Sequence, residues 1–183
     1  SEHYDEILAG KSGFLNMTFY TIRLCLYALI WSGFAFIMRR ESLREDEIGG
    51  TESYFKMRKW SAIFLVLFAV SSSTSAWDIL MSIDAHWFST LFGWYTFAGM
   101  FVSSLTVITM ITLYLKGKGY LPNVNENHIH DLGKFMFAFS VFWTYLWFAQ
   151  FMLIWYANLP EEVAYYIPRQ GYFRPVFIAN LLI

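Results

Sequence analysis

Long apolar runs separated by short polar segments dominate this sequence. Four runs of about 17 residues or more cover residues 14–38, 60–76, 87–115 and 135–157, and a fifth begins near residue 176. A helix needs about 20 mostly apolar residues to cross the roughly 30 Å hydrocarbon core of a bilayer. Only 15% of the residues are charged, whereas soluble domains have about 25%. The sequence therefore predicts an all-α, polytopic transmembrane helix bundle with four full spans and a truncated fifth.

We expect one membrane domain over residues 1–183. Because the chain starts at Ser1 and stops at Ile183 within an apolar run, we expect it to be a fragment of a longer subunit.

Basic residues gather between the first two runs and between the third and fourth, whereas Trp77–His86 has none. The positive-inside rule places the two basic loops in the cytoplasm and Trp77–His86 outside. We interpret Arg39–Lys59, which contains two adjacent glycines, as a solvated loop.

Arg23 is the first polar residue that we expect inside the membrane. If it lay at the edge, only Leu24–Met38 would remain to span, about 22 Å of helix. Arg23 either extends its charge to the membrane surface or pairs with a buried partner. Asn16, Tyr20, Arg23 and Tyr27 follow helical spacing, so they form one polar stripe.

A second polar stripe follows the end of the second run. Ser71, Ser75, Asp78 and Ser82 share one face if that helix continues past residue 76. Small hydroxyl residues allow close packing between membrane helices. A ladder of hydroxyl groups that leads to a carboxylate also suits a water-filled half-channel. The sequence leaves both interpretations open.

Asp78, Asp84 and His86 lie within nine residues at the expected outer end of two spans, with no basic residue beside them. Such a cluster can exchange protons near neutral pH or form hydrogen bonds with the head group of a quinol. The alternative is helix capping within an interfacial loop, because Asp is a good N-cap. If a proton path exists, we expect these three groups to exchange protons with the outside. The inward relay would then consist of Ser71, Ser75, Tyr27 and Arg23.

Metal and redox centres are not expected in this chain. His128, His130 and Asp131 make a poor zinc site without a further ligand, so we expect Asp131 to cap a helix that begins near residue 132. Cys25 is the only cysteine and no histidine lies in the middle of a run, so a Cys-ligated iron–sulfur cluster and a transmembrane bis-histidine haem are excluded within this chain. The net charge of -1 offers no basic surface for nucleic acid.

Several long strings resemble a membrane subunit of bacterial alternative complex III. They are Ala76–Asp78, Ser82–Tyr95, Gly119–Pro122, Val124–Lys134 and Phe142–Glu162. The resemblance extends from about residue 9 to residue 160 and is to the F subunit of that complex. This subunit is similar to the polysulphide-reductase membrane-anchor (NrfD-like) family, which has a four-helix bundle at its centre.

The resemblance implies a subunit of a quinol:cytochrome c oxidoreductase in the respiratory chain of a bacterial inner (cytoplasmic) membrane. Its partners would be the NrfD-like sister subunit, an iron–sulfur subunit and cytochrome c subunits, often with a terminal oxidase. Haem c and iron–sulfur clusters would lie in those partners. The sister subunit is usually assigned the working quinol site, so we expect a non-catalytic chain that carries a proton path and is compatible with a bound quinone. The rival interpretations are a purely structural anchor, a transporter of an ion or small solute, and direct quinol oxidation in this chain.

Overall fold

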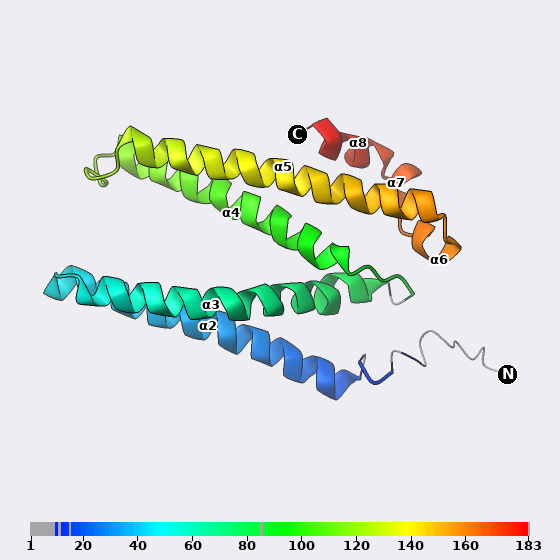
Figure 1. Cartoon of the computed structure of the whole chain (residues 1–183), viewed down its shortest axis with the longest axis horizontal. Helices are drawn as coiled ribbons and strands as arrows, with labels where there is room; N and C mark the ends of the chain where they lie inside the picture. Colours follow the sequence, from blue (N-terminus) through cyan, green and yellow to red (C-terminus); the bar gives the residue numbers. More distant parts are fainter. Residues whose placement is uncertain (1–9, 11, 15, 85, 183) are drawn as a thin grey trace. The chain divides into compact units, whose positions relative to one another are not determined.

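The computed structural model describes residues 10, 12–14, 16–84 and 86–182 (Figure 1). It is 83% helical, and the described residues contain no β-strand. Within the described ranges, four helical segments are long and apolar enough to cross a membrane. They are α2 (Met17–Ile48), α3 (Glu52–Ser75) with its continuation through Ile83, α4 (Leu91–Gly117) and α5 (Glu126–Ala157). The chain is therefore an all-α, multi-pass membrane protein, as the apolar runs predict.

The helices extend further than the apolar runs. Both α2 and α5 have 32 residues, which is about 48 Å of helix against a hydrocarbon core of roughly 30 Å. The prediction of a loop over Arg39–Lys59 was wrong, because α2 continues to Ile48 and α3 begins at Glu52. Arg, Glu and Leu in this segment are good helix formers. The charged residues limit the length of the membrane span, but they do not end the helix.

Glycines end α2. Gly49 and Gly50 have φ angles of 71° and 86°, in the left-handed region that side chains with a Cβ rarely adopt. The next helix starts at once, and Lys56 Nζ lies 2.6 Å from Glu52 Oε1 in its first turns. Three residues, 49–51, therefore connect the two helices.

The start of α5 also differs from the prediction. Asn125, and not Asp131, is the N-cap: its side chain accepts a hydrogen bond from the His128 amide, and His128 Nδ1 accepts one from the Asn125 amide, both at 3.2 Å. This reciprocal capping satisfies two amide donors at the helix start. Asp131 lies within the helix and pairs with Lys134 at 3.2 Å.

The chain forms two compact units, residues 1–86 and 87–183, and each is described by itself. Within the first, α2 and α3 form an antiparallel hairpin (Figure 1). The helix α3 continues as a π-helix, η1 (Ala76–Leu80), and a 3-10 turn, η2 (Met81–Ile83). The single membrane domain over the whole chain stays a prediction.

In the second unit, α4 and α5 form the hairpin, with Tyr95 stacked on Trp143 at 5.7 Å between ring centroids. Three short helices follow: α6 (Pro160–Val163), α7 (Ile167–Gln170) and α8 (Arg174–Leu182). The last of these, which covers the fifth apolar run, packs beside α5 through Trp147 and Phe177, whose ring centroids are 5.3 Å apart. Tyr165 and Tyr166 lie between α6 and α7. Burial raises the pKa of both phenols, so both stay neutral at physiological pH.

Two helical glycines allow a test of the packing in the hairpins. A Cβ on Gly99 would lie 3.0 Å from Trp143 Nε1, whereas a Cβ on Gly33 would meet nothing within 4 Å. We expect Gly99→Ala to lower the free energy of unfolding by about 1–3 kcal/mol, because the indole must move. The matched Gly33→Ala should raise it by about 0.5–1 kcal/mol, since alanine loses less backbone entropy in a helix. Unfolding in detergent, followed by circular dichroism, measures both, and an equal effect of the two would contradict the packing of α4 on α5.

Candidate functional site: a buried ion pair between two membrane helices

The α2–α3 hairpin brings Arg23 and Asp78 together as a bidentate ion pair. Arg23 Nε donates to Asp78 Oδ2 at 2.8 Å, and Nη2 donates to Oδ1 at 2.7 Å. The Tyr27 hydroxyl donates to Asp78 Oδ2 at 2.7 Å. The Asp78 side chain is fully buried, and that of Arg23 is 11% exposed. We call Arg23, Tyr27 and Asp78 the acid cluster.

Local sequence explains how the acid cluster forms. Arg23 and Tyr27 are four residues apart on α2, so they lie on one helix face. Asp78 is in the π-helix that continues α3, and such segments occur often at functional sites. Ser71, Ser75 and Asp78 are all buried, as expected for the shared face that the sequence predicts. The Ser82 hydroxyl donates to the backbone carbonyl of Asp78, which supports the turn that follows it.

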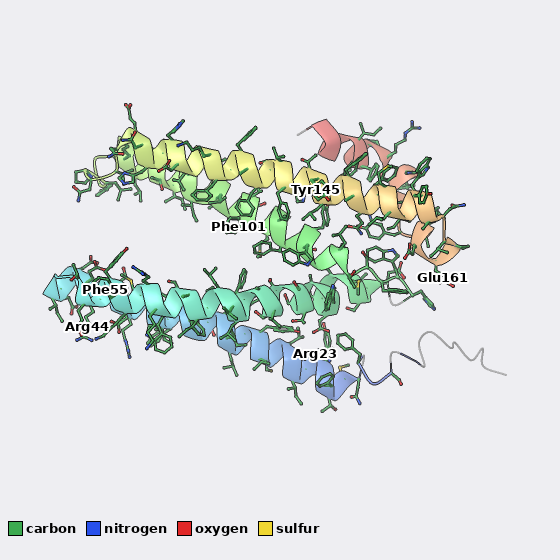
Figure 2. All side chains as sticks on the ribbon, viewed as in Figure 1. Arg23, Arg44, Phe55, Phe101, Tyr145 and Glu161 are labelled. Carbon is green, nitrogen blue, oxygen red and sulfur yellow. The ribbon has the colours of Figure 1, made fainter. Side chains whose placement is uncertain are left out.

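Aromatic groups cover the guanidinium of Arg23. Its Cζ lies 4.0 Å from the Phe14 ring centroid and 4.3 Å from that of Phe19, within cation–π range. Nη2 also donates to the Phe14 carbonyl at 3.0 Å. Within the described part of the chain, Nη1 is buried and has no hydrogen-bond partner. Figure 2 labels Arg23 near the beginning of α2 and Arg44 towards its other end. Sequence analysis gave two alternatives for Arg23, a charge that extends to the membrane surface and a buried partner. The structure has the second, because Arg23 pairs with Asp78.

The serines of the second stripe contact the hairpin in different ways. Ser71 Oγ accepts a hydrogen bond from Trp31 Nε1 at 3.0 Å, across to α2. Ser75 Oγ donates to the Ser72 carbonyl of its own helix at 2.9 Å. Sequence reasoning missed Trp31, although it lies four residues after Tyr27 and extends the polar stripe of α2 by one turn.

Beyond Ser71, aromatic side chains supply contacts between α2 and α3. Phe34 of α2 contacts Phe64 of α3 at 5.3 Å between ring centroids, and within α3 Phe64 contacts Phe68 at the same distance. The next polar contact joins Ser61 to the Met38 sulfur at 3.5 Å. Ser61 is ten residues before Ser71, which is about 15 Å of helix. Between Ser71 and Ser61 the hairpin therefore has aromatic contacts, and its buried Arg23–Asp78 pair lies at the end on the other side of Ser71.

Asp84 and His86 differ from Asp78 in their surroundings. Both are exposed, whereas Asp78 is fully buried. Asp84 follows the 3-10 turn, and its amide donates to the Met81 carbonyl at 3.2 Å. The structure thus brings Arg23, Tyr27 and Asp78 together, and leaves Asp84 and His86 at the surface beyond the turn.

Glu41 and Gln150 are also buried polar side chains, and the sequence did not predict them as site residues. Glu41 is 4% exposed, and its Oε2 has no hydrogen-bond partner among the described residues. Gln150 is 3% exposed and lies in the second unit. The described residues contain no group of three or more His, Cys, Asp or Glu side chains that could hold a metal ion.

Comparison with known proteins gives no match: no protein-family model matches this sequence, and no curated protein is significantly similar to it.

The ion pair can be tested by replacing one or both partners with apolar residues. Removing one partner of a buried pair costs about 3–5 kcal/mol, whereas replacing both is close to neutral. We expect Arg23→Met and Asp78→Leu each to lower the free energy of unfolding by about that amount, and the double variant to recover most of it. Unfolding of the purified protein in detergent measures all three.

The exposed pair of Lys134 and Asp131 is the matched control, because its side chains are 63% and 62% exposed. Its double-mutant cycle should give a coupling of about 1 kcal/mol or less. Additive effects of Arg23→Met and Asp78→Leu would contradict the buried pair.

Proposed function

We propose that this chain is a membrane subunit of a bacterial quinol:cytochrome c oxidoreductase of the alternative-complex-III type, and that its acid cluster belongs to a proton path. The chain itself would hold no redox centre. Haem c and iron–sulfur clusters would lie in the cytochrome c and iron–sulfur subunits, beside an NrfD-like sister subunit. The resemblance of the sequence strings supports the assignment to this complex, and the four membrane helices agree with an integral subunit.

The observation that carries the proton path is the buried carboxylate of Asp78 with a guanidinium and a phenol on its oxygens. An ionisable side chain within a membrane span is costly, about 2.5–3.5 kcal/mol on insertion scales, and such residues are rare and commonly functional. In the proposed path the Asp78 carboxylate accepts the proton, and the Tyr27 hydroxyl, which donates to Oδ2, passes it on.

The proposed path is confined to one end of the α2–α3 hairpin. Asp84 and His86 are exposed a few residues after Asp78, so they are suited to exchange protons with water. Ser71 extends the polar region by about two turns. The aromatic contacts of Phe34, Phe64 and Phe68 follow it, so we assign this hairpin only the outer section of a path, which would continue through another part of the complex.

A structural anchor is the second candidate, and one observation favours it. Both Asp78 oxygens already have protein partners at 2.7–2.8 Å, as in an ion pair that fixes two helices. In that case the acid cluster would matter for assembly and would have no effect on proton transfer.

Two variants of the acid cluster distinguish these candidates. In the proton-path model, Asp78→Asn should reduce protons released per electron pair by about half or more in vesicles that contain the purified complex. Tyr27→Phe keeps the ring and removes only the hydroxyl, so it should reduce proton release while costing about 0.5–1.5 kcal/mol of stability. Proton release and quinol:cytochrome c turnover are measured on the same vesicles, with the exposed Asp131→Asn as control.

The structural candidate predicts the opposite pattern. Asp78→Asn would then yield less assembled complex, with an unchanged ratio of protons to electrons in what remains.

The assignment to this complex is tested first, by purifying the chain from native membranes and identifying the subunits that accompany it. A preparation without haem c and iron–sulfur subunits would end the assignment to a quinol:cytochrome c oxidoreductase.

A further inference from the structure

The end of the second unit contains an apolar groove beside one positively charged side chain. The helices α7 and α8 follow α6 at the end of α5 (Figure 1). Residues of α7, of α8 and of the turn between them line a cavity of about 290 Å³, close to the lower end of small-molecule sites, about 300–1,000 Å³. The lining residues are Pro168, Arg169, Phe173, Val176 and Phe177. We call this cavity the Arg169 groove.

The guanidinium of Arg169 is fixed in place and still accessible. Its Cζ lies 3.4 Å from the Tyr165 ring centroid, and its Nη1 donates to the Tyr165 carbonyl. The Tyr165 ring in turn stacks on the buried Trp87, at 4.1 Å between ring centroids. Nε and Nη2 have no hydrogen-bond partner among the described residues, and neither atom is buried. Two nitrogens of a positioned guanidinium can therefore donate to a ligand.

The charge around the Arg169 groove favours an anion. Among the described residues, no carboxylate forms an ion pair with Arg169. Residues 163–183 include two basic residues, Arg169 and Arg174, and no acidic residue. A guanidinium matches the geometry of a phosphate, to which it can donate two parallel hydrogen bonds. The ammonium of a zwitterionic head group would find no carboxylate on this segment, so a head group with net negative charge fits better.

The groove lies where a bilayer supplies both phosphate and hydrocarbon. The helix α5, which is long and apolar enough to cross a membrane, ends at Ala157, and the connection to α8 follows it. Head groups occupy the layer just outside the hydrocarbon core, and tyrosines, such as the exposed Tyr172, are enriched at that depth. Phe173 and Val176 are 55% and 61% exposed. A hydrocarbon chain would remove their apolar surface from water, which is favourable.

We propose that the Arg169 groove binds an anionic phospholipid. Its phosphate oxygens accept hydrogen bonds from Nε and Nη2 of Arg169, and the first part of one acyl chain lies against Phe173, Val176 and Phe177. The proposal uses no residue of the acid cluster, and it does not depend on the assignment of the chain to a respiratory complex.

The test uses the full chain, purified with its native assembly, stripped of lipid by detergent and titrated with three probes. The probes are phosphatidylglycerol, a diacylglycerol with the same acyl chains, and glycerol phosphate. Native mass spectrometry measures the dissociation constant of each. We expect phosphatidylglycerol to bind about tenfold more tightly than diacylglycerol, as for hydrogen bonds to a charged group. Equal affinity for these two probes overturns the proposal, and glycerol phosphate that binds as tightly as phosphatidylglycerol overturns it in favour of a site for free phosphate.

Three variants locate the binding. Arg169→Gln should weaken phosphatidylglycerol binding about tenfold, whereas Arg174→Gln, the same change of charge outside the groove, should weaken it less than about twofold. Val176→Trp fills the groove and leaves the stacking of Arg169 on Tyr165 intact, so it should weaken binding about fivefold by excluding the acyl chain. An equal loss in Arg169→Gln and Arg174→Gln would assign the binding to overall charge and overturn the proposal, as would unchanged affinity in Val176→Trp.

Discussion

The pairing of Arg23 with Asp78 is the interaction on which the first unit depends. Neither charge has water to solvate it within a bilayer, and each alone would cost about 2.5–3.5 kcal/mol on insertion scales. The two residues are 55 positions apart, so their bidentate contact joins the beginning of α2 to the π-helix after α3. It sets how the two helices are aligned along their length, and the bonds from Tyr27 to Asp78 and from Trp31 to Ser71 follow from that alignment.

Polar side-chain contacts are not evenly spread along the α2–α3 hairpin, and their distribution limits where a proton path could use it. The described contacts change from charged and hydroxyl groups near Asp78 to phenylalanines beyond Ser71. A hydrogen-bonded relay needs donors and acceptors within about 3 Å of each other, and phenylalanine rings supply none. The hairpin is thus suited to receive or release a proton at one end, and this is why the proposed path uses it only there.

The second unit presents the contrasting case of a buried polar group that lacks a partner. Asp78 has protein donors on both carboxylate oxygens, whereas the buried Gln150 amide nitrogen has no acceptor among the described residues. The same physical rule applies to both, because an unpaired polar group is expensive where water is excluded. At Asp78 the protein supplies the partners and an ion pair results, whereas at Gln150 the described residues leave the amide nitrogen without one.

Sequence alone determined the class of protein, the four membrane helices and the place of Arg23 inside the first of them, because apolar length and helical spacing are local properties of the chain. It also placed Ser71, Ser75 and Asp78 on one face. It failed over Arg39–Lys59, since charge limits the membrane span but not the helix, and at Asp131, since the Asn125 capping box begins α5 earlier. Only the tertiary structure decided that Arg23 meets Asp78, that Asp84 and His86 stay exposed, and that the Gln150 amide nitrogen is buried. These depend on how two helices align and on how the chain turns after residue 75, which no single stretch of sequence specifies.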